Sequence, residues 1–419
     1  MITLSNPKEV IMNLQNLQEH HGELLSFMES NGYAEAYVQR FRLAISRILS
    51  EPGQNRWTSY TDIYLDYEKR SGSANYLRQM RTVIGAIEQF DIYGRMPDAR
   101  HRHTLFERGS YHLLIPEFKE LIDYYRQHER QRGKKDATIN GQSHNAATFL
   151  HHLQEQGTSC LDNITEDAVL SFFISEDGEL IRSSSYKNNV AAVLKACLEW
   201  KGPQCRRLLG YLPALKKRRR NIQYLTKEEV SAVRTAIEQQ PLSMRNRAVM
   251  LLLILTGIRS SDIACLTLDS IDWETATVCI CQKKTGLPLE LPLTPVIGNA
   301  IFDYLTQERP DTESRRLFLS ETWPFSPLAD NSIENIVAKV FRMAGIRQSP
   351  GERKGTHIFR HNAASSMLEN GVQQPVISKT LGHSSPQSLE TYLSADFVHL
   401  KECALGIETF PVAKGVFPI

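Results

Sequence analysis

Residues 245–257, RNRAVMLLLILTG, place the strongest constraint on how this 419-residue chain can fold. The apolar residues of this stretch would cover nearly every side of a helix, so a helix here has to be buried at the centre of a domain. Its longest apolar run, AVMLLLIL, is far shorter than the roughly 20 residues that cross a membrane. We therefore expect this helix to form the core of a soluble domain.

The sequence around this helix predicts a mostly α-helical domain with one small sheet. TKEE at 226–229 has the spacing of a capping box, which marks the start of a helix. Residues 276–293, ATVCICQKKTGLPLELPL, give two short β-type runs around KKTGLP, the pattern of an antiparallel hairpin. Helical spacing returns at 295–307 and 332–345. We assign this domain to residues 223–405, followed by a tail.

Two helical domains are predicted ahead of it. Apolar residues at helical spacing indicate one domain over residues 1–95 and a second over 110–205, with Pro116 in a first helical turn and Gly202 as a helix stop. A basic linker over 206–222 would join the second domain to the next. No internal repeat is evident. The fold class is mainly α: helical N-terminal domains, then a mostly α domain with a small antiparallel sheet.

Charge indicates a polyanionic partner only locally. The net charge is +2, but residues 201–222 contain eight basic residues and no acidic one. Basic side chains in such a segment can displace counterions from phosphate groups, so we expect DNA contact here. A solvated charge run and a nuclear-import signal would use the same residues. The candidate contacts are Lys216, Lys217, Arg218, Arg219 and Arg220.

The cysteines and the N-terminus indicate the cell compartment. The seven cysteines are scattered and form no CxxC pair, so we expect reduced thiols in a cytosolic protein rather than a disulfide framework. The first residues lack the apolar stretch of a signal peptide. No carboxylate or His/Cys set suggests a metal site, and we expect no cofactor.

Two arginines and a histidine are candidates for binding phosphate. Arg259 follows the buried helix and would project from a rigid base, although it could instead bond the last carbonyls of that helix. His357 and Arg360 are spaced i, i+3 and would share one helix face. Two guanidinium groups on one phosphate would neutralise the charge of a pentacoordinate transition state. The alternative for His357 and Arg360 is an ordinary surface helix.

Three further residues suit proton transfer and nucleophilic attack. Lys284, at the hairpin turn, could protonate a departing alkoxide, with Lys283 as a neighbouring alternative. His383 follows a helix-ending glycine and could bond a phosphate oxygen or cap the helix. Tyr392 could be a core residue, or a nucleophile if nearby positive charges favour its phenolate, because a phenol with pKa ~10 is mostly protonated at neutral pH.

The combination of these residues in this order resembles the tyrosine recombinase/phage integrase family. TGIRSSDIACLTLDSI (256–271) is similar to the first arginine segment of that family, and THIFRHNAASSMLENG (356–371) to the second. ISKTLGHSSPQSLETYL (377–393) is similar to the segment that ends in the nucleophile. The resemblance spans residues 223–400 and favours Lys284 over Lys283, because Lys284 precedes Thr-Gly and lies eight residues before Pro292.

The resemblance implies a role for each residue. Tyr392 would attack the scissile phosphate, giving a 3′-phosphotyrosyl link and a free 5′-hydroxyl. Arg259 and Arg360 would hold the non-bridging oxygens, and His383 would add a hydrogen bond. Lys284 would protonate the leaving oxygen, and His357 would assist proton transfer at the tyrosine. Neither ATP nor a metal is implied. Asp262 would brace Arg259, or is simply an N-terminal helix charge.

The resemblance also implies partners. Residues 110–205 would be a core-binding domain that clamps the DNA duplex together with 223–405, and the basic linker would cross the DNA backbone. Residues 1–95 would contact accessory DNA or protein. The tail, 406–419, would dock in trans. Four protomers would assemble on two duplexes from monomers in solution, and a directionality factor stays open.

The biological expectation is integration or excision of a mobile element by a cytoplasmic enzyme acting on the bacterial nucleoid. Two alternatives are a relaxing enzyme like type IB topoisomerase and a catalytically silent DNA-binding protein of the same fold. The complete set of six candidate residues argues against the silent protein.

Overall fold

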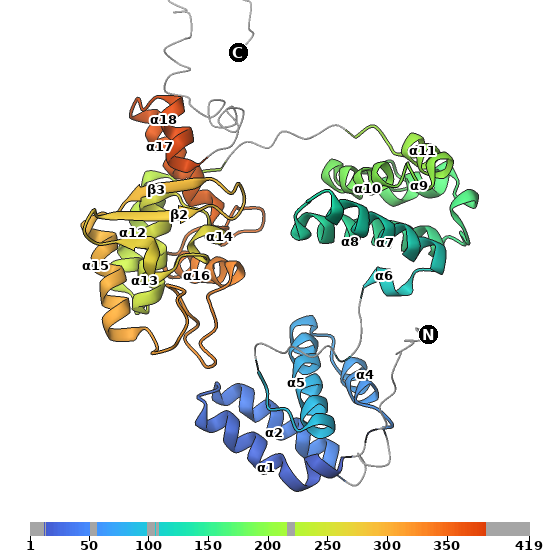
Figure 1. Ribbon diagram of the computed structural model, residues 1–419, viewed down its shortest axis with the longest axis horizontal. Coiled ribbons are helices and arrows are strands. Elements are labelled where there is room, and N and C mark those ends of the chain that lie inside the picture. The colour runs from blue at the N-terminus through green and yellow to red at the C-terminus, as the bar shows by residue number, and fades with distance from the viewer. Residues whose placement is uncertain are drawn as a thin grey trace, which may run out of the picture. The chain divides into compact units, whose positions relative to one another are not determined.

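The computed structural model describes residues 12, 14–50, 57–98, 105, 109–215 and 223–382. The basic cluster Lys216–Arg220, the candidates His383 and Tyr392, and the tail 406–419 lie outside these residues. The chain divides into two compact units, of which the second takes residues 220 onward together with the short stretch 27–35. Each helical group is described by itself below (Figure 1).

The N-terminal helical group has four described helices. They are α1 (Gln15–Ser30), α2 (Glu35–Leu49), α4 (Tyr60–Arg70) and α5 (Ala74–Tyr93). Ser59 begins α4 with a complete capping box to Asp62, and Ser73 begins α5 by accepting the backbone N–H of Tyr76. Gly94 ends α5 in the left-handed conformation that glycine adopts without strain.

The second helical group begins with α6 (Ser110–Leu113) and α7 (Pro116–Gln131), where Pro116 takes a first-turn position as predicted. It continues with α8 (Asp136–Glu155), α9 (Glu166–Phe173), α10 (Ser184–Ala196) and α11 (Gly202–Tyr211). The prediction that Gly202 stops a helix is wrong, because Gly202 opens α11. That helix buries Cys205 and Leu208 in the core of this group, so residues 206–211 are helical rather than an extended linker.

The C-terminal unit starts with α12 (Lys227–Gln239), α13 (Met244–Thr256) and the short α14 (Ser260–Ile263). The strands β1 (Ile271–Asp272), β2 (Thr277–Cys281) and β3 (Pro288–Pro292) follow. The remaining helices are α15 (Pro295–Asp303), α16 (Asp330–Met343), α17 (His357–Glu369) and α18 (Gln374–Leu381). This mostly helical unit with one small sheet, after helical N-terminal groups, confirms the predicted fold class.

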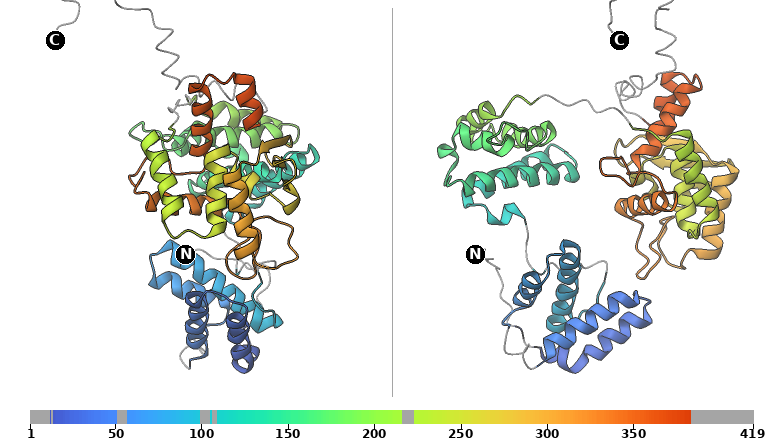
Figure 2. Two further views of the ribbon diagram at one scale, coloured as in Figure 1. Left: turned by 90° about the vertical axis from the view of Figure 1, so that its left-hand side faces the viewer. Right: turned by 180° about the vertical axis from the view of Figure 1, so that it is seen from behind.

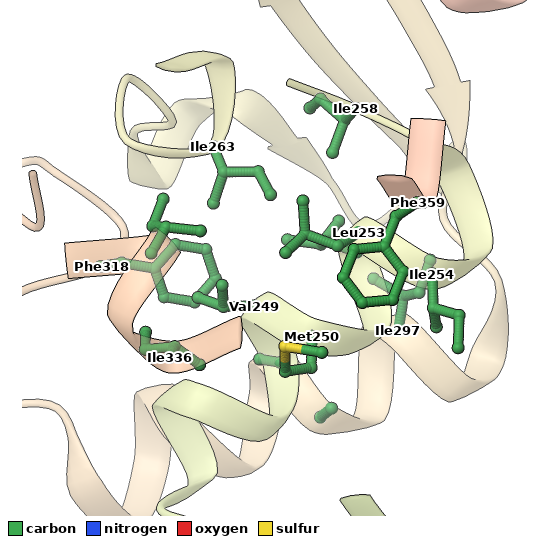
Figure 3. Close-up of a cluster of buried hydrophobic side chains, with 14 of the residues drawn as sticks. Val249, Met250, Leu253, Ile254, Ile258, Ile263, Ile297, Phe318, Ile336 and Phe359 are labelled. Carbon is green, nitrogen blue, oxygen red and sulfur yellow. The ribbon is translucent and has the colours of Figure 1, made fainter. Parts of the chain in front are cut away.

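Helix α13 is the centre of the C-terminal core, as its sequence predicts. Figure 3 shows Val249, Met250, Leu253 and Ile254 of α13 surrounded by buried side chains of other elements. Among these are Phe318, Ile336 of α16 and Phe359 of α17, each at most 6% exposed. Burying such a side chain contributes about 1.5–3 kcal/mol. The core therefore fixes the ends of α13 and α17, where the candidate arginines lie. Figure 2 shows the ribbon of this unit, from yellow-green to orange-red, in two further views.

The predicted hairpin is present, with a third strand added. The three strands are antiparallel in the order β1-β2-β3, and the last pair before the turn is Cys281 with Pro288. Leu289 and Leu291 of β3 face the core, and Glu290 between them is exposed. Strand β1 was not predicted, because two residues are too few to show an alternating pattern.

Within the described ranges, no helix has the length and hydropathy of a membrane span.

Candidate active site

Gly257 allows α17 to lie against the end of α13. Its φ of +64° is in the left-handed region, and a Cβ there would lie 2.8 Å from the Cβ of Ala363 and 3.3 Å from the Cα of Arg360. Only glycine fits this approach without strain. The contact places Arg259, two residues after Gly257, beside Arg360 of α17.

The two candidate arginines converge on one dipeptide, Leu381–Gly382. Arg259 Nη2 donates to the carbonyl of Gly382 at 3.2 Å, and Arg360 Nη2 donates to the carbonyl of Leu381. Arg360 Nη1 also donates to the carbonyl of Gly257 at 3.3 Å. Arg360 is 4% exposed and the side chain of Arg259 is 12% exposed. Arg259 therefore does not cap α13, since its acceptor lies at the end of α18.

Asp262 connects Arg259 to the hairpin turn. This carboxylate is completely buried, and its Oδ1 accepts the backbone N–H of Lys283 at 2.9 Å. Its Oδ2 lies 3.7 Å from Arg259 Nη1, so the two charges form an ion pair. The geometry favours a bracing role for Asp262, which holds both the guanidinium and the turn.

The hairpin turn carries both candidate lysines. Lys283 is held by the N–H bond to Asp262 and by an ion pair of Nζ with Asp330 Oδ2 at 3.5 Å. Lys284 is exposed at the tip. The turn is also fastened by Gln282, which is 1% exposed and donates through Nε2 to the Leu381 carbonyl at 3.4 Å.

Gly382 ends α18 with a φ of +59°, and a Cβ at this position would collide with the amide group of Gln282. The carbonyls of the Leu381–Gly382 dipeptide thus accept hydrogen bonds from Arg259, Arg360 and Gln282. Gln282 was missed by the sequence analysis, since a lone glutamine beside a turn carries no distinctive signal.

His357 lies at the start of α17, where burial and neighbouring charges change its pKa. Partial burial lowers its pKa, and the positive charges of Arg353, Arg360 and Lys284 lower it further, while Glu334 opposes them. The imidazole is therefore neutral at pH 7 and able to accept a proton. Its ring also lies 6.3 Å from that of His361, whose pKa is lowered to about 4, chiefly by burial.

Glu334 of α16 fixes the beginning of α17. Its carboxylate accepts the backbone N–H of Thr356 at 2.9 Å and the hydroxyl of Thr356 at 2.6 Å. The same hydroxyl lies 3.3 Å from the hydroxyl of Ser260 in α14. The two arginine segments are thus connected through Thr356, directly before His357, and Ser260, directly after Arg259.

The structure brings four of the six candidates toward one region: Arg259 and Arg360 directly, Lys284 through the turn beside Asp262, and His357 through α17. His383 and Tyr392 lie outside the described residues, and His383 is the residue directly after Gly382. No group of His, Cys, Asp or Glu side chains suited to a metal occurs in the part of the chain that the structure describes.

Known proteins resemble the C-terminal part of the chain. Residues 223–399 match the model of the phage integrase family. The "Putative integrase/recombinase y4gC" of Sinorhizobium fredii is 34% identical over 185 residues, which cover 44% of this chain and 94% of that protein. Tyrosine recombinase XerA of Pyrococcus furiosus is 30% identical over 183 residues, 42% of this chain and 59% of that protein.

Solved structures share the fold. The XerH site-specific recombinase in its post-cleavage complex with a palindromic difH substrate matches with a TM-score of 0.51 at 17% identity, over 97% of this chain and 100% of that one. The Tn1549 transposon integrase with transposon right-end DNA matches with a TM-score of 0.50 at 14% identity, over 68% and 99%. Together with the family match and the similarity to y4gC, this shows that the chain belongs to the phage integrase family of tyrosine recombinases.

Proposed function

We propose that this protein is a site-specific DNA recombinase that cleaves and rejoins DNA through a 3′-phosphotyrosyl intermediate. The observation that carries the proposal is the convergence of Arg259 and Arg360 on the residues directly before His383. Two guanidinium groups that bond adjacent carbonyls, one buried and one partly exposed, form a positive site suited to one phosphate. Phosphoryl transfer depends mainly on such positioning and electrostatic stabilisation.

In the proposed cleavage step, the phenolic oxygen of Tyr392 attacks phosphorus and the bond from phosphorus to the 5′-oxygen breaks. His357, neutral at pH 7, accepts the phenolic proton, and Lys284 gives a proton to the leaving oxygen. Arg259 and Arg360 stabilise the non-bridging oxygens, and His383 donates a hydrogen bond. Lys284 is favoured over Lys283 by the resemblance to the family, because Lys284 precedes Thr-Gly and lies eight residues before Pro292.

The bond energy of the phosphodiester is kept in the phosphotyrosyl link, so rejoining is the reverse reaction with a different 5′-hydroxyl. The step balances without ATP, an oxidant or a metal ion. The positive side chains supply the charge stabilisation that a metal ion provides in other phosphoryl-transfer enzymes.

The same proposal assigns a partner to the other parts of the chain. The second helical group and the C-terminal unit would clamp the duplex, and Lys216–Arg220 would contact its backbone. Four protomers would assemble on two duplexes, with residues 406–419 docking on a neighbouring copy. Integration or excision of a mobile element is the proposed biological act, in view of the integrase names among the relatives.

Covalent capture in cells tests this function. The protein and its Tyr392→Phe variant are expressed in cells that carry candidate element and host DNA. The cells are lysed under denaturing conditions, and the DNA that stays covalently linked to the protein is recovered and sequenced. We expect enrichment at one locus for the unchanged protein and none for the variant. The matched control is Tyr211→Phe, which removes a tyrosine hydroxyl at the end of α11 and should leave capture unchanged.

Each result has a defined meaning. Equal recovery with Tyr392→Phe would exclude Tyr392 as the nucleophile. DNA that is bound at one locus but never covalently linked would favour a catalytically silent DNA-binding protein. Linkage spread evenly over the DNA would favour a relaxing enzyme of the topoisomerase type.

A further inference from the structure

Gln282 is a buried polar side chain between the hairpin and the end of α18. It follows the last residue of β2 and is 1% exposed. Burying an amide costs free energy unless its donor and acceptor are both hydrogen-bonded. Both are used here: Nε2 donates to the carbonyl of Leu381 at 3.4 Å, and Oε1 accepts the hydroxyl of Thr285 at 2.7 Å. These partners set the orientation of the amide, because a carbonyl oxygen can only accept a hydrogen bond.

The backbone of Gln282 closes the turn that follows it. Its N–H donates to the carbonyl of Leu287 at 2.9 Å, and its carbonyl accepts the N–H of Gly286 at 2.8 Å. Lys284 lies between Gln282 and Thr285 in the chain, so the hydrogen bond from Thr285 to the amide closes over the residue that carries the proposed proton donor. The backbone at Lys284 is therefore held by Gln282 on both sides.

The hairpin and α18 pack into different apolar clusters. Val278, Leu289 and Leu291 of the hairpin belong to the main core of the C-terminal unit, whereas Ile377 and Leu381 of α18 belong to a smaller cluster that they form with α17. Apolar packing has no direction of its own, so it does not by itself fix the turn against α18. The hydrogen bond from the Gln282 amide to the end of α18 supplies a directed connection between the two clusters.

Each arginine of the site is connected to the turn by its own acceptor. The Leu381 carbonyl that accepts the amide of Gln282 also accepts Arg360 Nη2. The carboxylate of Asp262 pairs with Arg259 and accepts a backbone N–H of the turn at 2.9 Å. One connection thus depends on a charged group and the other on a neutral amide, and both lead from the turn to the arginine pair.

We infer that Gln282 is a positioning residue for the proton donor of the cleavage step: its side chain holds the turn that carries Lys284 at a fixed place relative to the arginine pair. The inference rests on the function proposed above, in which Lys284 protonates the leaving 5′-oxygen. Gln282 takes no part in the chemistry itself. A displacement of a catalytic group by about 1 Å can cost 100-fold in rate, so a bond that fixes the turn can control this step.

The inference predicts that Gln282 matters only where the leaving group needs a proton. An alkoxide leaves slowly unless it is protonated while the bond to phosphorus breaks. When sulfur replaces the bridging 5′-oxygen, the phosphorus–sulfur bond breaks instead and a thiolate leaves with the electron pair. The thiolate needs no proton, because thiols are far more acidic than alcohols. Oxygen and sulfur at this position therefore separate proton donation from the other tasks of the site.

Cleavage of two duplexes by the full-length protein tests the inference. Both contain the locus found by covalent capture, and one has sulfur in place of the bridging 5′-oxygen at the cleaved phosphate. Gln282→Met keeps the length of the side chain and removes both of its hydrogen bonds, and Thr285→Val removes one of them. Lys284→Ala is the reference for a lost proton donor. The matched control is Ile301→Val, which shortens a completely buried side chain of α15.

On the oxygen duplex we expect covalent linkage about 10- to 100-fold slower with Gln282→Met, and at least about 100-fold slower with Lys284→Ala. Thr285→Val should cause a smaller loss, and Ile301→Val none. On the sulfur duplex the rates of all four variants should approach that of the unchanged protein. Urea denaturation of each variant separates a loss of stability from a loss of rate.

Two results would overturn the inference: equal slowing of Gln282→Met on both duplexes, and an unchanged rate of this variant on the oxygen duplex. Either one leaves the covalent link at Tyr392 intact, so it is distinguishable from failure of the proposed function. Equal slowing of Lys284→Ala on both duplexes would remove the proton donor from the proposed mechanism and the inference with it. Absence of any link to Tyr392 on either duplex would overturn the proposed function as a whole.

Discussion

Arg347 and Glu229 form a bidentate ion pair, with Nε and Nη2 of the arginine 2.8 and 2.9 Å from the two carboxylate oxygens. The same carboxylate accepts the N–H of Thr226 at 2.9 Å and so completes the capping box of α12. Arg347 Nη2 also donates to the carbonyl of Tyr224 at 2.8 Å. The first described residues of the C-terminal unit are thereby fastened to the loop that leads to α17.

Replacing Arg347 with glutamine should destabilise the C-terminal unit. The change leaves Glu229 partly buried without its partner, and breaking a fully buried pair costs about 3–5 kcal/mol. Because Glu229 retains 20% of its side-chain exposure, we expect a loss of about 2–3 kcal/mol in the free energy of unfolding. Urea denaturation measures it. Arg315→Gln, which breaks an exposed pair with Asp269, should cause no measurable change.

Replacing Gly382 with alanine should impair both stability and cleavage. Gly382 and Gly371 both have positive φ, and a Cβ at Gly371 would meet nothing within 4 Å. Gly371→Ala should therefore cost only the backbone strain of about 1–2 kcal/mol. Gly382→Ala adds a collision with Gln282 and displaces the carbonyl that Arg259 bonds. We expect a larger fall in melting temperature and at least a tenfold slower covalent linkage; equal effects of the two changes would contradict the packing described here.

Two substitutions of Asp262 separate its hydrogen bond to the hairpin turn from its ion pair with Arg259. Asp262→Asn keeps an acceptor for the N–H of Lys283 but removes the charge paired with Arg259, and Asp262→Ala removes both. Misplacing a catalytic group by about 1 Å can cost 100-fold in rate, so we expect a loss on the order of 10-fold for asparagine and 100-fold for alanine. The rate of covalent linkage to the captured locus measures this, with Asp303→Asn on the exposed side of α15 as control. Unchanged rates in Asp262→Ala would refute the bracing role.

Stability should fall in mild acid because of His361. Its folded pKa, about 4, lies below the ordinary value of 6.5, so the proton binds more tightly to the unfolded chain. The stability that the neutral ring contributes is complete above pH 6.5 and is lost as the pH falls toward 4. Partial exposure reduces the effect, and we expect a loss of about 1 kcal/mol between pH 7 and 5. His361→Gln should flatten this pH dependence in urea titrations; an identical dependence in the variant would assign it to other groups.

The sequence predicted the elements that depend on local chemistry. The capping box of Thr226 and Glu229, the buried α13, the hairpin and the helix at His357 and Arg360 are all confirmed. Each has a pattern that arises within a few residues: a cap, an apolar run, an alternation or a helical spacing.

Long-range contacts could not be predicted, because no local pattern encodes them. Arg259 finds its acceptor 123 residues away, and Gln282 reaches Leu381 across 99 residues.

The pairing of β2 with β3 separates the buried face of the hairpin from its tip. Leu289 and Leu291 share one face of β3 because they are two residues apart, and their pairing with Ile280 and Val278 keeps that face on the core. A slip of β3 by one residue would turn both leucines outward and carry Glu290 inward. A hairpin loop can differ in length while the strands keep their register, so the tip that carries Lys284 can change its reach at little cost to the core.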